Sequence, residues 1–169
     1  MGHPVLRARA RSLERHEIQG DRIQGLVDDM IDTMREYQGV GLAAPQVHES
    51  VRLFVAGMDG DDDALPLVTL INPEIEPVGN RVTEDWEGCL SIPDLRGRVT
   101  RPHDIVVRAL DRHGRDVEMQ LSGYPARVVQ HEADHLDGVL FLDRMDSFES
   151  LAFLEEFSRF WSERHVPEE

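Results

Sequence analysis

The 169-residue sequence predicts an α+β fold, in which small, mostly antiparallel or mixed sheets surround a central helix. Three observations lead to this fold class. Apolar residues recur at helical spacing near both ends of the chain and again after residue 123. Short strand-like runs fill the region between these helical segments. The links between the runs are too short for parallel crossovers, which favours antiparallel pairing. With no repeat or low-complexity linker, residues 1–169 are expected to form a single domain.

The first predicted helix occupies residues 20–39, "GDRIQGLVDDMIDTMREYQG". Asp21 is expected to be its N-cap and Gly39 to stop it. Its apolar positions fall every three or four residues and so share one face of the helix. They are Ile23, Leu26, Val27, Met30, Ile31 and Met34.

Strands are expected after this helix, where β-branched and apolar residues gather in short runs. The third run contains Pro77, which cannot donate a backbone hydrogen bond, so we expect it at a sheet edge. The segment "RHGR" is typical of a hairpin turn between the last two runs. The predicted strands cover residues 51–57, 66–72, 74–79, 97–101, 104–111 and 116–123.

Two helices are expected in the last third of the chain. The first is "YPARVVQHEADHLDG" (124–138), with Pro125 in its first turn and Gly138 just past its end. The second is expected in residues 147–165, where Ser147 and Ser150 precede an apolar stripe. The stripe consists of Leu151, Leu154, Phe157 and Phe160.

The composition limits the classes of function. The net charge is −15, from 33 acidic and 18 basic side chains, so we expect no direct nucleic-acid binding over most of the surface and no membrane association. The longest apolar runs are far shorter than the roughly 18 residues of a membrane span. The acidic segment "MDGDDDALP" (58–66) is predicted to be a solvated loop and not a calcium site, because it lacks the loop glycine and the distal glutamate at the positions that an EF-hand requires. The single cysteine, Cys89, indicates a reducing compartment, and we expect the cytoplasm.

The segment "QHEADHLDG" (130–138) is the strongest candidate for chemistry. His131 and His135 lie one turn apart on the same face of the predicted helix, so both imidazoles can bind one metal ion. Glu132 can reach a water molecule on that ion without being a ligand. Tyr124 and Val128 share the face of His131, which indicates that the face is buried. Buried histidines are unfavourable unless they are paired or bound to a metal, so a metal site is favoured over a solvated helix surface.

The third metal ligand remains open at this point. A catalytic site has three protein ligands and leaves a position for water. Cys89 in "EGCLS" (87–91) offers a thiolate, and Gly88 beside it lets backbone N–H groups approach the bound group. Glu155 and Glu156 are the alternative, as in a zinc peptidase, although they also suit the exposed face of the last helix.

A non-catalytic metal or redox-sensing module is a further alternative. It requires a fourth protein ligand. None is obvious near the other three, since His103 and His113 fall at strand or hairpin positions.

The segment "GVGLAAPQ" (39–46) completes the candidate site. Gly39 and Gly41 permit close approach of the backbone. A phosphate-binding loop is disfavoured, because no lysine follows and no strand precedes. The side-chain amide of Gln46 can donate a hydrogen bond to an oxyanion.

Together, these three segments resemble the motifs of the peptide deformylase family, whose members remove the N-formyl group from nascent polypeptides. The motifs stand here as "GVGLAAPQ", "EGCLS" and "QHEADHLDG", in that order. The likeness extends to "GHPVLR" at the start and to "FLDRM" after the last motif, and so covers essentially the whole chain. The combination of three motifs is much more specific than any one of them.

The resemblance implies a role for each motif. The metal ligands would be Cys89, His131 and His135. Glu132 would be the general base and acid. Gln46 and the backbone N–H of Leu90 would donate hydrogen bonds to the oxyanion.

The substrate peptide, by the same resemblance, would lie along Val40 and Gly41 like an added strand. Its first side chain would enter a pocket formed by Tyr124 and Val128, with Gly88 also beside the peptide. Arg96 is a weaker candidate on the substrate side. The chain departs from many family members at Gln38, where they have a glutamate, and this change is expected to alter only a local ion pair.

The function that the resemblance implies is metal-dependent hydrolysis of a linear amide, the N-formyl group of N-formylmethionyl peptides, with release of formate. The family favours Fe(II) as the metal, and a thiolate with two imidazoles also suits Zn, Ni or Co. The expected partners are the formylated peptide and, transiently, the ribosome. The alternatives are the zinc peptidase and the non-catalytic module.

Overall fold

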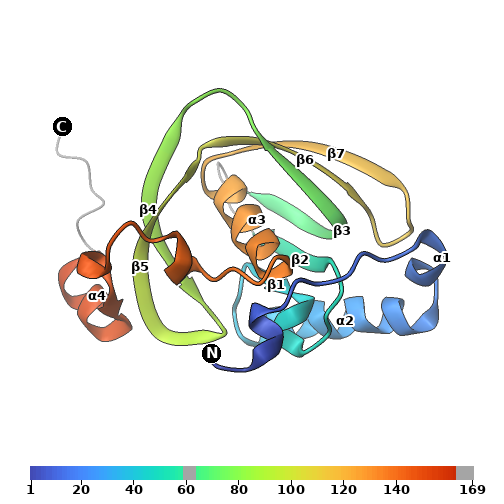
Figure 1. Ribbon diagram of the computed structural model, residues 1–169, viewed down its shortest axis with the longest axis horizontal. Helices are drawn as coiled ribbons and strands as arrows, with labels where there is room; N and C mark the ends of the chain where they lie inside the picture. Colours follow the sequence, from blue (N-terminus) through green and yellow to red (C-terminus); the bar gives the residue numbers. More distant parts are fainter. Residues whose placement is uncertain (59–63, 163–169) are drawn as a thin grey trace.

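A computed structural model describes residues 1–58 and 64–162 of the chain (Figure 1). It contains a five-stranded antiparallel sheet, a three-stranded antiparallel sheet and four α-helices. This confirms the predicted α+β class. Most of the acidic loop and the end of the last predicted helix lie outside the described residues. Among the residues described, no helix is long and apolar enough to cross a membrane.

The five-stranded sheet has the strand order β1-β2-β3-β6-β7. Its strands are β1 (Gly41–Ala43), β2 (Leu53–Met58), β3 (Leu65–Pro77), β6 (Asp104–Leu110) and β7 (Asp116–Ser122). Side chains alternate between its two faces, as strand geometry requires. In β2, Leu53 and Val55 pack in a core cluster with α2 (Asp21–Glu36), whereas Phe54 and Ala56 pack with α3 (Gly123–Leu136).

The three-stranded sheet has the order β4-β5-β8. It consists of β4 (Val82–Cys89), β5 (Ile92–Pro102) and β8 (Ala152–Phe153). Figure 1 shows α3 between the arch formed by β4 and β5 and the larger sheet, and α3 contacts strands of both sheets. The central helix therefore joins the two sheets.

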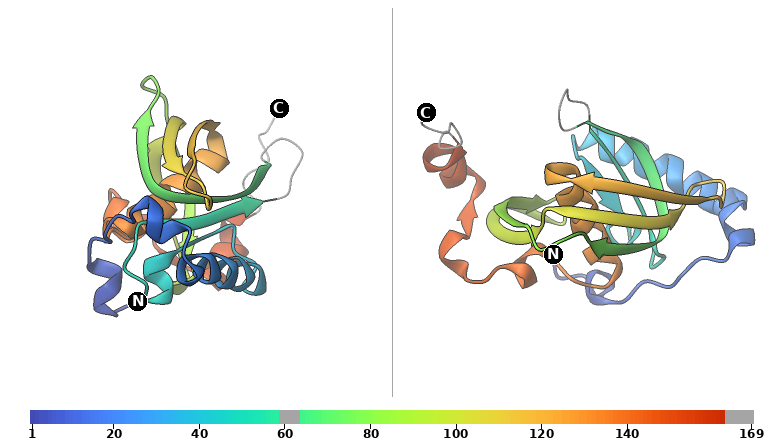
Figure 2. Two further views of the ribbon diagram at one scale, coloured as in Figure 1. Left: turned by 90° about the vertical axis from the view of Figure 1, so that its right-hand side faces the viewer. Right: turned by 90° about the horizontal axis from the view of Figure 1, so that it is seen from above.

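The remaining elements are short. They are η1 (Pro4–Arg7), α1 (Arg15–Ile18), η2 (Ala44–Val47), η3 (Phe141–Arg144), η4 (Phe148–Ser150) and α4 (Leu154–Phe160). In Figures 1 and 2, α1 and α4 lie at opposite ends of the molecule, with α3 between them.

Several predicted boundaries were wrong in the strands. Residues 66–72 and 74–79 form one strand, β3, with an irregularity in pairing between Ile71 and Glu74. As a whole, this strand lies between β2 and β6, but, among the described residues, residues 74–77 pair with β6 alone, so this segment has one unpaired edge, as Pro77 predicted. Pro77 is tolerated because it is the last residue of β3, beyond the segment that pairs with β2. The prediction of residues 97–101 was too short for β5, and β4 was not predicted.

The helices also correct the predictions in detail. Gly20 is the N-cap of α2 and Asp21 its first residue. This helix ends at Glu36, before Gln38, whose φ of 53° places it in the left-handed region. The last helix begins at Leu154 and not near Ser147, because the preceding residues pair with β5 as strand β8. The predictions for α3 and for the β6–β7 hairpin are confirmed.

Candidate metal centre and active site

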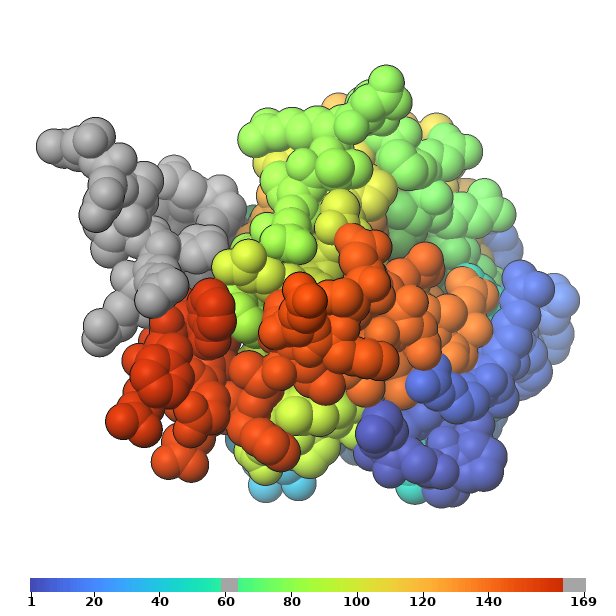
Figure 3. Space-filling view, turned by 60° about the vertical axis from the view of Figure 1, so that its left-hand side comes forward, coloured from blue at the N-terminus to red at the C-terminus, as the bar shows by residue number. Residues whose placement is uncertain are grey.

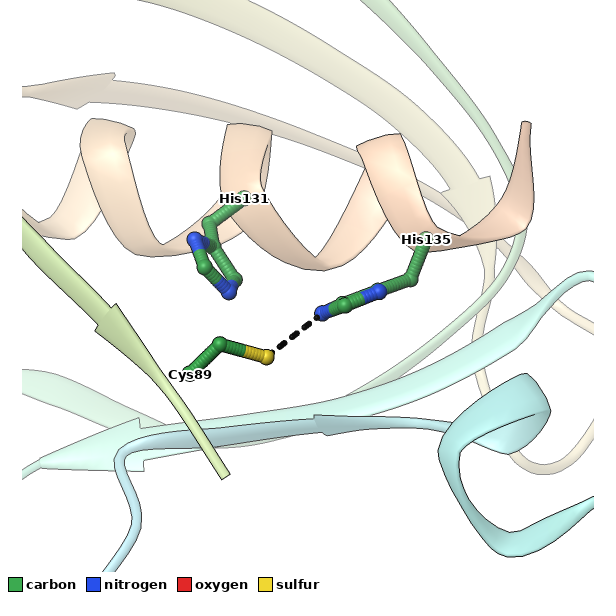
Figure 4. Close-up of side chains that lie close together, drawn as sticks. All are labelled: Cys89, His131 and His135. Atoms are coloured by element: carbon green, nitrogen blue, oxygen red, sulfur yellow. Dashed lines mark hydrogen bonds between the residues drawn. The ribbon is translucent and has the colours of Figure 1, made fainter. Parts of the chain in front are cut away.

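Cys89, His131 and His135 come together where the end of β4 meets α3 (Figure 4). One ligand atom from each lies within 4.8 Å of the other two, and the Cys89 Sγ atom is 3.2 Å from His135 Nε2. All three residues are buried. The pairing of β4 with β5 is irregular between Glu87 and Cys89. Such irregularities redirect side chains, and here the sulfur points toward the two rings.

The residues fit a divalent transition-metal ion. One thiolate and two imidazoles are a donor set that such ions bind well. Next to them, the Glu132 Oε2 atom is buried and has no hydrogen-bond partner among the described residues. Burying an unpaired carboxylate oxygen is unfavourable. A water molecule or substrate group beside the metal would satisfy this oxygen.

Glu87 holds His131 in the orientation that a metal site needs. Its Oε2 atom lies 2.9 Å from His131 Nδ1, which leaves Nε2 as the metal-binding atom of the ring. Arg101 binds both oxygens of Glu87, at 2.6 and 2.9 Å, and Arg127 donates a further hydrogen bond at 2.8 Å. Arg101 also donates to Asp134 on α3, at 2.9 Å. The sequence interpretation missed this network, although Glu87 opens the "EGCLS" motif.

The pKa values of the two histidines are shifted in opposite directions. Burial and the positive charges of His131 and Arg101 lower the pKa of His135 to about 3, so its ring is neutral near pH 7. Burial also lowers the pKa of His131, but the contacts with Cys89 and Glu87 outweigh burial and raise it to about 10 in the absence of a cation. Metal binding at His131 would therefore release a proton.

Glu132 lies at the backbone of Gly41. A Cβ atom at residue 41 would overlap the carboxylate of Glu132, so only glycine allows this approach. Burial raises the pKa of Glu132 to about 7, opposed in part by the charge of His131. A carboxyl group with a pKa close to the ambient pH is suited to both accept and donate a proton.

Gln46 and Leu90 lie beside the cysteine. The Gln46 Oε1 atom accepts a hydrogen bond from the backbone N–H of Ala43, at 2.7 Å, which fixes the amide. Its Nε2 atom then faces Ser91 Oγ at 3.2 Å and Cys89 Sγ at 3.6 Å. Leu90 is partly exposed at the cleft. The structure therefore places Gln46 and Leu90, the two residues predicted to supply oxyanion donors, beside Cys89.

A cleft of about 560 Å³ opens onto the site. The five residues predicted to contact substrate all line it: Val40, Gly41, Gly88, Tyr124 and Val128. Arg96 and Gln38 line it as well. Val128 is buried, as its helix face predicted, but Tyr124 is 42% exposed, so the buried face does not extend to the start of α3.

Residues 1–150 match the profile of the family described as Polypeptide deformylase. The chain belongs to this family. It is 43% identical over 162 residues to peptide deformylase 1 of Prochlorococcus marinus, an alignment that covers 92% of this chain and 83% of the relative.

Solved deformylase structures have the same fold. A class I type b peptide deformylase from Acinetobacter baumannii with bound Met-Ala-Ser superposes with a TM-score of 0.81 at 37% identity, over 86% of this chain and 94% of that one. The enzyme from Synechococcus elongatus in complex with actinonin gives 0.80 at 38% identity, over 94% of this chain and 81% of that one. These similarities agree with the resemblance of the three motifs.

The alternative ligands are not at the centre. Glu155 and Glu156 are exposed on α4, and neither belongs to the group of Cys89, His131 and His135. The third ligand expected for a zinc peptidase is therefore not at the centre. Within residues 1–58 and 64–162, the three-ligand group does not extend to a fourth residue. His103 instead pairs with Asp104. The closed, four-ligand site of a structural module is therefore not favoured.

The buried ion pairs predict how stability depends on pH. Burial alone would raise the pKa of Glu87, but hydrogen bonds from Arg101 and His131 lower it from 4.5 to about 2. A carboxylate whose pKa is lower in the folded chain stabilises the folded state at every pH above its pKa in the unfolded chain. This contribution is lost as the pH falls through its pKa in the folded chain.

We therefore expect the metal-free chain to have a larger free energy of unfolding than the Glu87→Gln variant. The difference between the two should shrink as the pH falls from 4.5 toward 2. The decrease should be on the order of 3 kcal/mol, measured by urea unfolding of both proteins. A difference that stays constant over this range would contradict the assignment.

Proposed function

We propose that this chain is a metal-dependent peptide deformylase, which hydrolyses the N-formyl group of N-formylmethionyl peptides and releases formate. The main support is that Cys89, His131 and His135 meet beside Glu132, at a cleft that all of these residues except His135 line. We further propose that residues 1–169 act as one catalytic unit. Because the substrate is a nascent chain, we place the reaction in the cytoplasm, with transient contact with the ribosome.

The metal would be held by Cys89 Sγ and by one ring nitrogen of each histidine. When bound, it supplies Lewis acidity, which polarises the formyl carbonyl and lowers the pKa of water. We favour Fe(II), with Zn, Ni and Co also compatible, since one thiolate and two imidazoles suit all four. Glu87 keeps the His131 ring in place through Nδ1, at 2.9 Å.

Glu132 would move the proton. Its carboxylate takes a proton from the attacking water molecule and later gives it to the departing amine nitrogen. A pKa of about 7 allows both steps near neutral pH. Gly41 leaves room for the formyl group and the carboxylate to share this space, since the residue has no side chain to place there.

The substrate would bind as an extended strand along Val40 and Gly41. Its first side chain would contact Tyr124 and Val128, which both line the cleft. An unbranched, flexible methionine side chain suits a pocket of this kind. Gly88 and Arg96, which line the same cleft, would also contact the peptide.

Gln46→Ala is expected to lower kcat for formate release by about 10²-fold, because the amide donates to the oxygen that gains negative charge. The metal content should not change, since Gln46 is not a ligand. The rate and the bound metal would be measured on the same preparation. A rate within about threefold of the unmodified chain would exclude this role.

The function is tested by formate release from formyl-Met-Ala-Ser. The chain would be loaded with Fe(II) without oxygen, and half of it then treated with a chelator. We expect formate only from the metal-loaded half, and its return when Fe(II) is added back. Acetyl-Met-Ala-Ser is the second substrate, and a zinc peptidase would cleave one of its bonds between residues. Such cleavage, together with no formate from formyl-Met-Ala-Ser, would overturn the proposal.

A further inference from the structure

The short helix η3 follows α3 in the chain and packs beside the candidate metal centre, although none of its four described residues lines the cleft. The buried Phe141 ring of η3 stacks on the His131 ring, with 6.4 Å between the centroids and 22° between the planes. In Figure 3 the orange residues around η3 lie at the surface, beside the blue N-terminal segment. The last residue of η3, Arg144, has no role in the proposed hydrolysis.

Arg144 holds the carboxylate of Asp134 on α3. Its guanidinium donates to both carboxylate oxygens, from Nη2 to Oδ1 at 2.6 Å and from Nε to Oδ2 at 3.1 Å. Two parallel hydrogen bonds of this kind fix the relative orientation of the two groups. The side chain of Asp134 is 11% exposed, whereas that of Arg144 is 50% exposed. Within the residues described, no other side chain donates to Oδ1, so this buried oxygen depends on Arg144.

Asp134 is one link in a series of hydrogen bonds that ends at a metal ligand. Arg101 donates from Nη1 to Asp134 Oδ2, at 2.9 Å, and from Nε and Nη2 to the two oxygens of Glu87. Glu87 Oε2 lies 2.9 Å from His131 Nδ1. Both Arg101 and Glu87 are buried. Arg144 is therefore the half-exposed end of a series that leads through the interior to His131.

Removal of Arg144 would release this series at its outer end. Asp134 Oδ1 would lose its partner, and water would reach it from a cavity of about 360 Å³ that both residues line. A hydrated carboxylate has no single orientation, so Arg101 would lose the contact that fixes its Nη1 atom. The guanidinium would then be free to turn away from Glu87, and the His131 ring would be held less firmly.

We propose that Arg144 is a positioning residue for the metal ligand His131. It acts through Asp134, Arg101 and Glu87, and the inference rests on the metal centre of the proposed function. Removing a group that orients a ligand typically changes metal affinity by about 10–100-fold. Because Arg144 is several hydrogen bonds away from His131, we expect the lower end of this range.

The test measures the affinity of the full chain for Zn(II), by competition with a chromophoric chelator. Arg144→Ala should raise the dissociation constant by about tenfold. Arg144→Lys keeps the charge but not the paired hydrogen bonds, and should raise it by about threefold. Arg108→Ala is the matched control, because Arg108 is 48% exposed and pairs with Glu76 and Glu118, outside the series. It should leave the affinity unchanged.

A double substitution shows whether the effect passes through Glu87. In the Glu87→Gln background an amide cannot accept both hydrogen bonds of Arg101, so the connection to His131 is already weakened. Arg144→Ala should then change the dissociation constant by less than about threefold. Residues that act independently would instead show the same effect in both backgrounds.

A merely structural role of Arg144 predicts a different pattern. Arg144→Ala would then lower the free energy of unfolding of the metal-free chain, measured with urea, but would leave its Zn(II) affinity unchanged. That result overturns the inference, as does an equal loss of affinity in Arg108→Ala or the full effect in the Glu87→Gln background. If Arg144→Ala does not fold, Arg144→Lys decides the question by the same comparison.

Failure of the proposed function gives a distinct result, because the affinity measurement does not depend on formate. A chain that binds Zn(II) and loses affinity in Arg144→Ala, but releases no formate when loaded with Fe(II), would overturn the proposed hydrolysis and support the role of Arg144.

Discussion

Glu132→Gln is expected to lower kcat for formate release by about 10²–10⁴-fold while the protein still binds its metal. Glutamine has nearly the same shape as glutamate but cannot accept a proton from water. The carboxylate is not among the three residues that could hold the ion, so the metal content should be unaffected. The measurement is formate release together with elemental analysis of the same sample.

Glu156→Gln is the matched control for this variant. Glu156 is exposed on α4 and should tolerate the same change without loss of rate. If Glu132→Gln kept more than roughly a tenth of the original rate, the proton would have to move through another group.

Cys89→Ala is the second substitution with a large expected effect. It removes the single cysteine thiol of the chain and leaves two histidines to hold the ion. We expect metal affinity to fall by more than about 100-fold, which exceeds the effect usually seen for groups that only support a ligand. Formate release should fall to the background rate.

Glu155→Ala distinguishes this site from that of a zinc peptidase. Because Glu155 is exposed on α4, its removal should change neither metal content nor rate. The reverse pattern, with metal lost from Glu155→Ala and kept by Cys89→Ala, would contradict the assignment of the sulfur as a ligand.

The helical part of the site could be predicted from the sequence because its signals are local. In α3, the spacing of His131 and His135, the early Pro125 and the terminal Gly138 all lie within one segment, and the structure agrees with each. The close approach at Gly41 was also predicted from the glycine itself.

The strands were harder to predict, since their limits depend on partners far away in the chain. β3 is continuous because β2 pairs with its first half and β6 with its second half. In the same way, residues before α4 have a helical pattern but pair with β5. Hydrogen bonding to a neighbouring strand outweighed local preference in both places.

The role of Glu87 could not be predicted for a related reason. A glutamate in a strand usually faces water. This one is buried because Arg101, fourteen residues later, and Arg127, on α3, both donate to it. Only the folded chain brings the two cations to the carboxylate.

The network around Glu87 also bears on how the centre acquires its ion. Its charged groups tie together the strand that carries the sulfur and the helix that carries the imidazoles, and none of these ties uses the ion itself. We therefore expect these ion pairs to hold Cys89 close to the two histidines whether or not an ion is bound. On the proposed function, the metal would then be exchangeable without unfolding, unlike that of a zinc finger, whose folding depends on its metal.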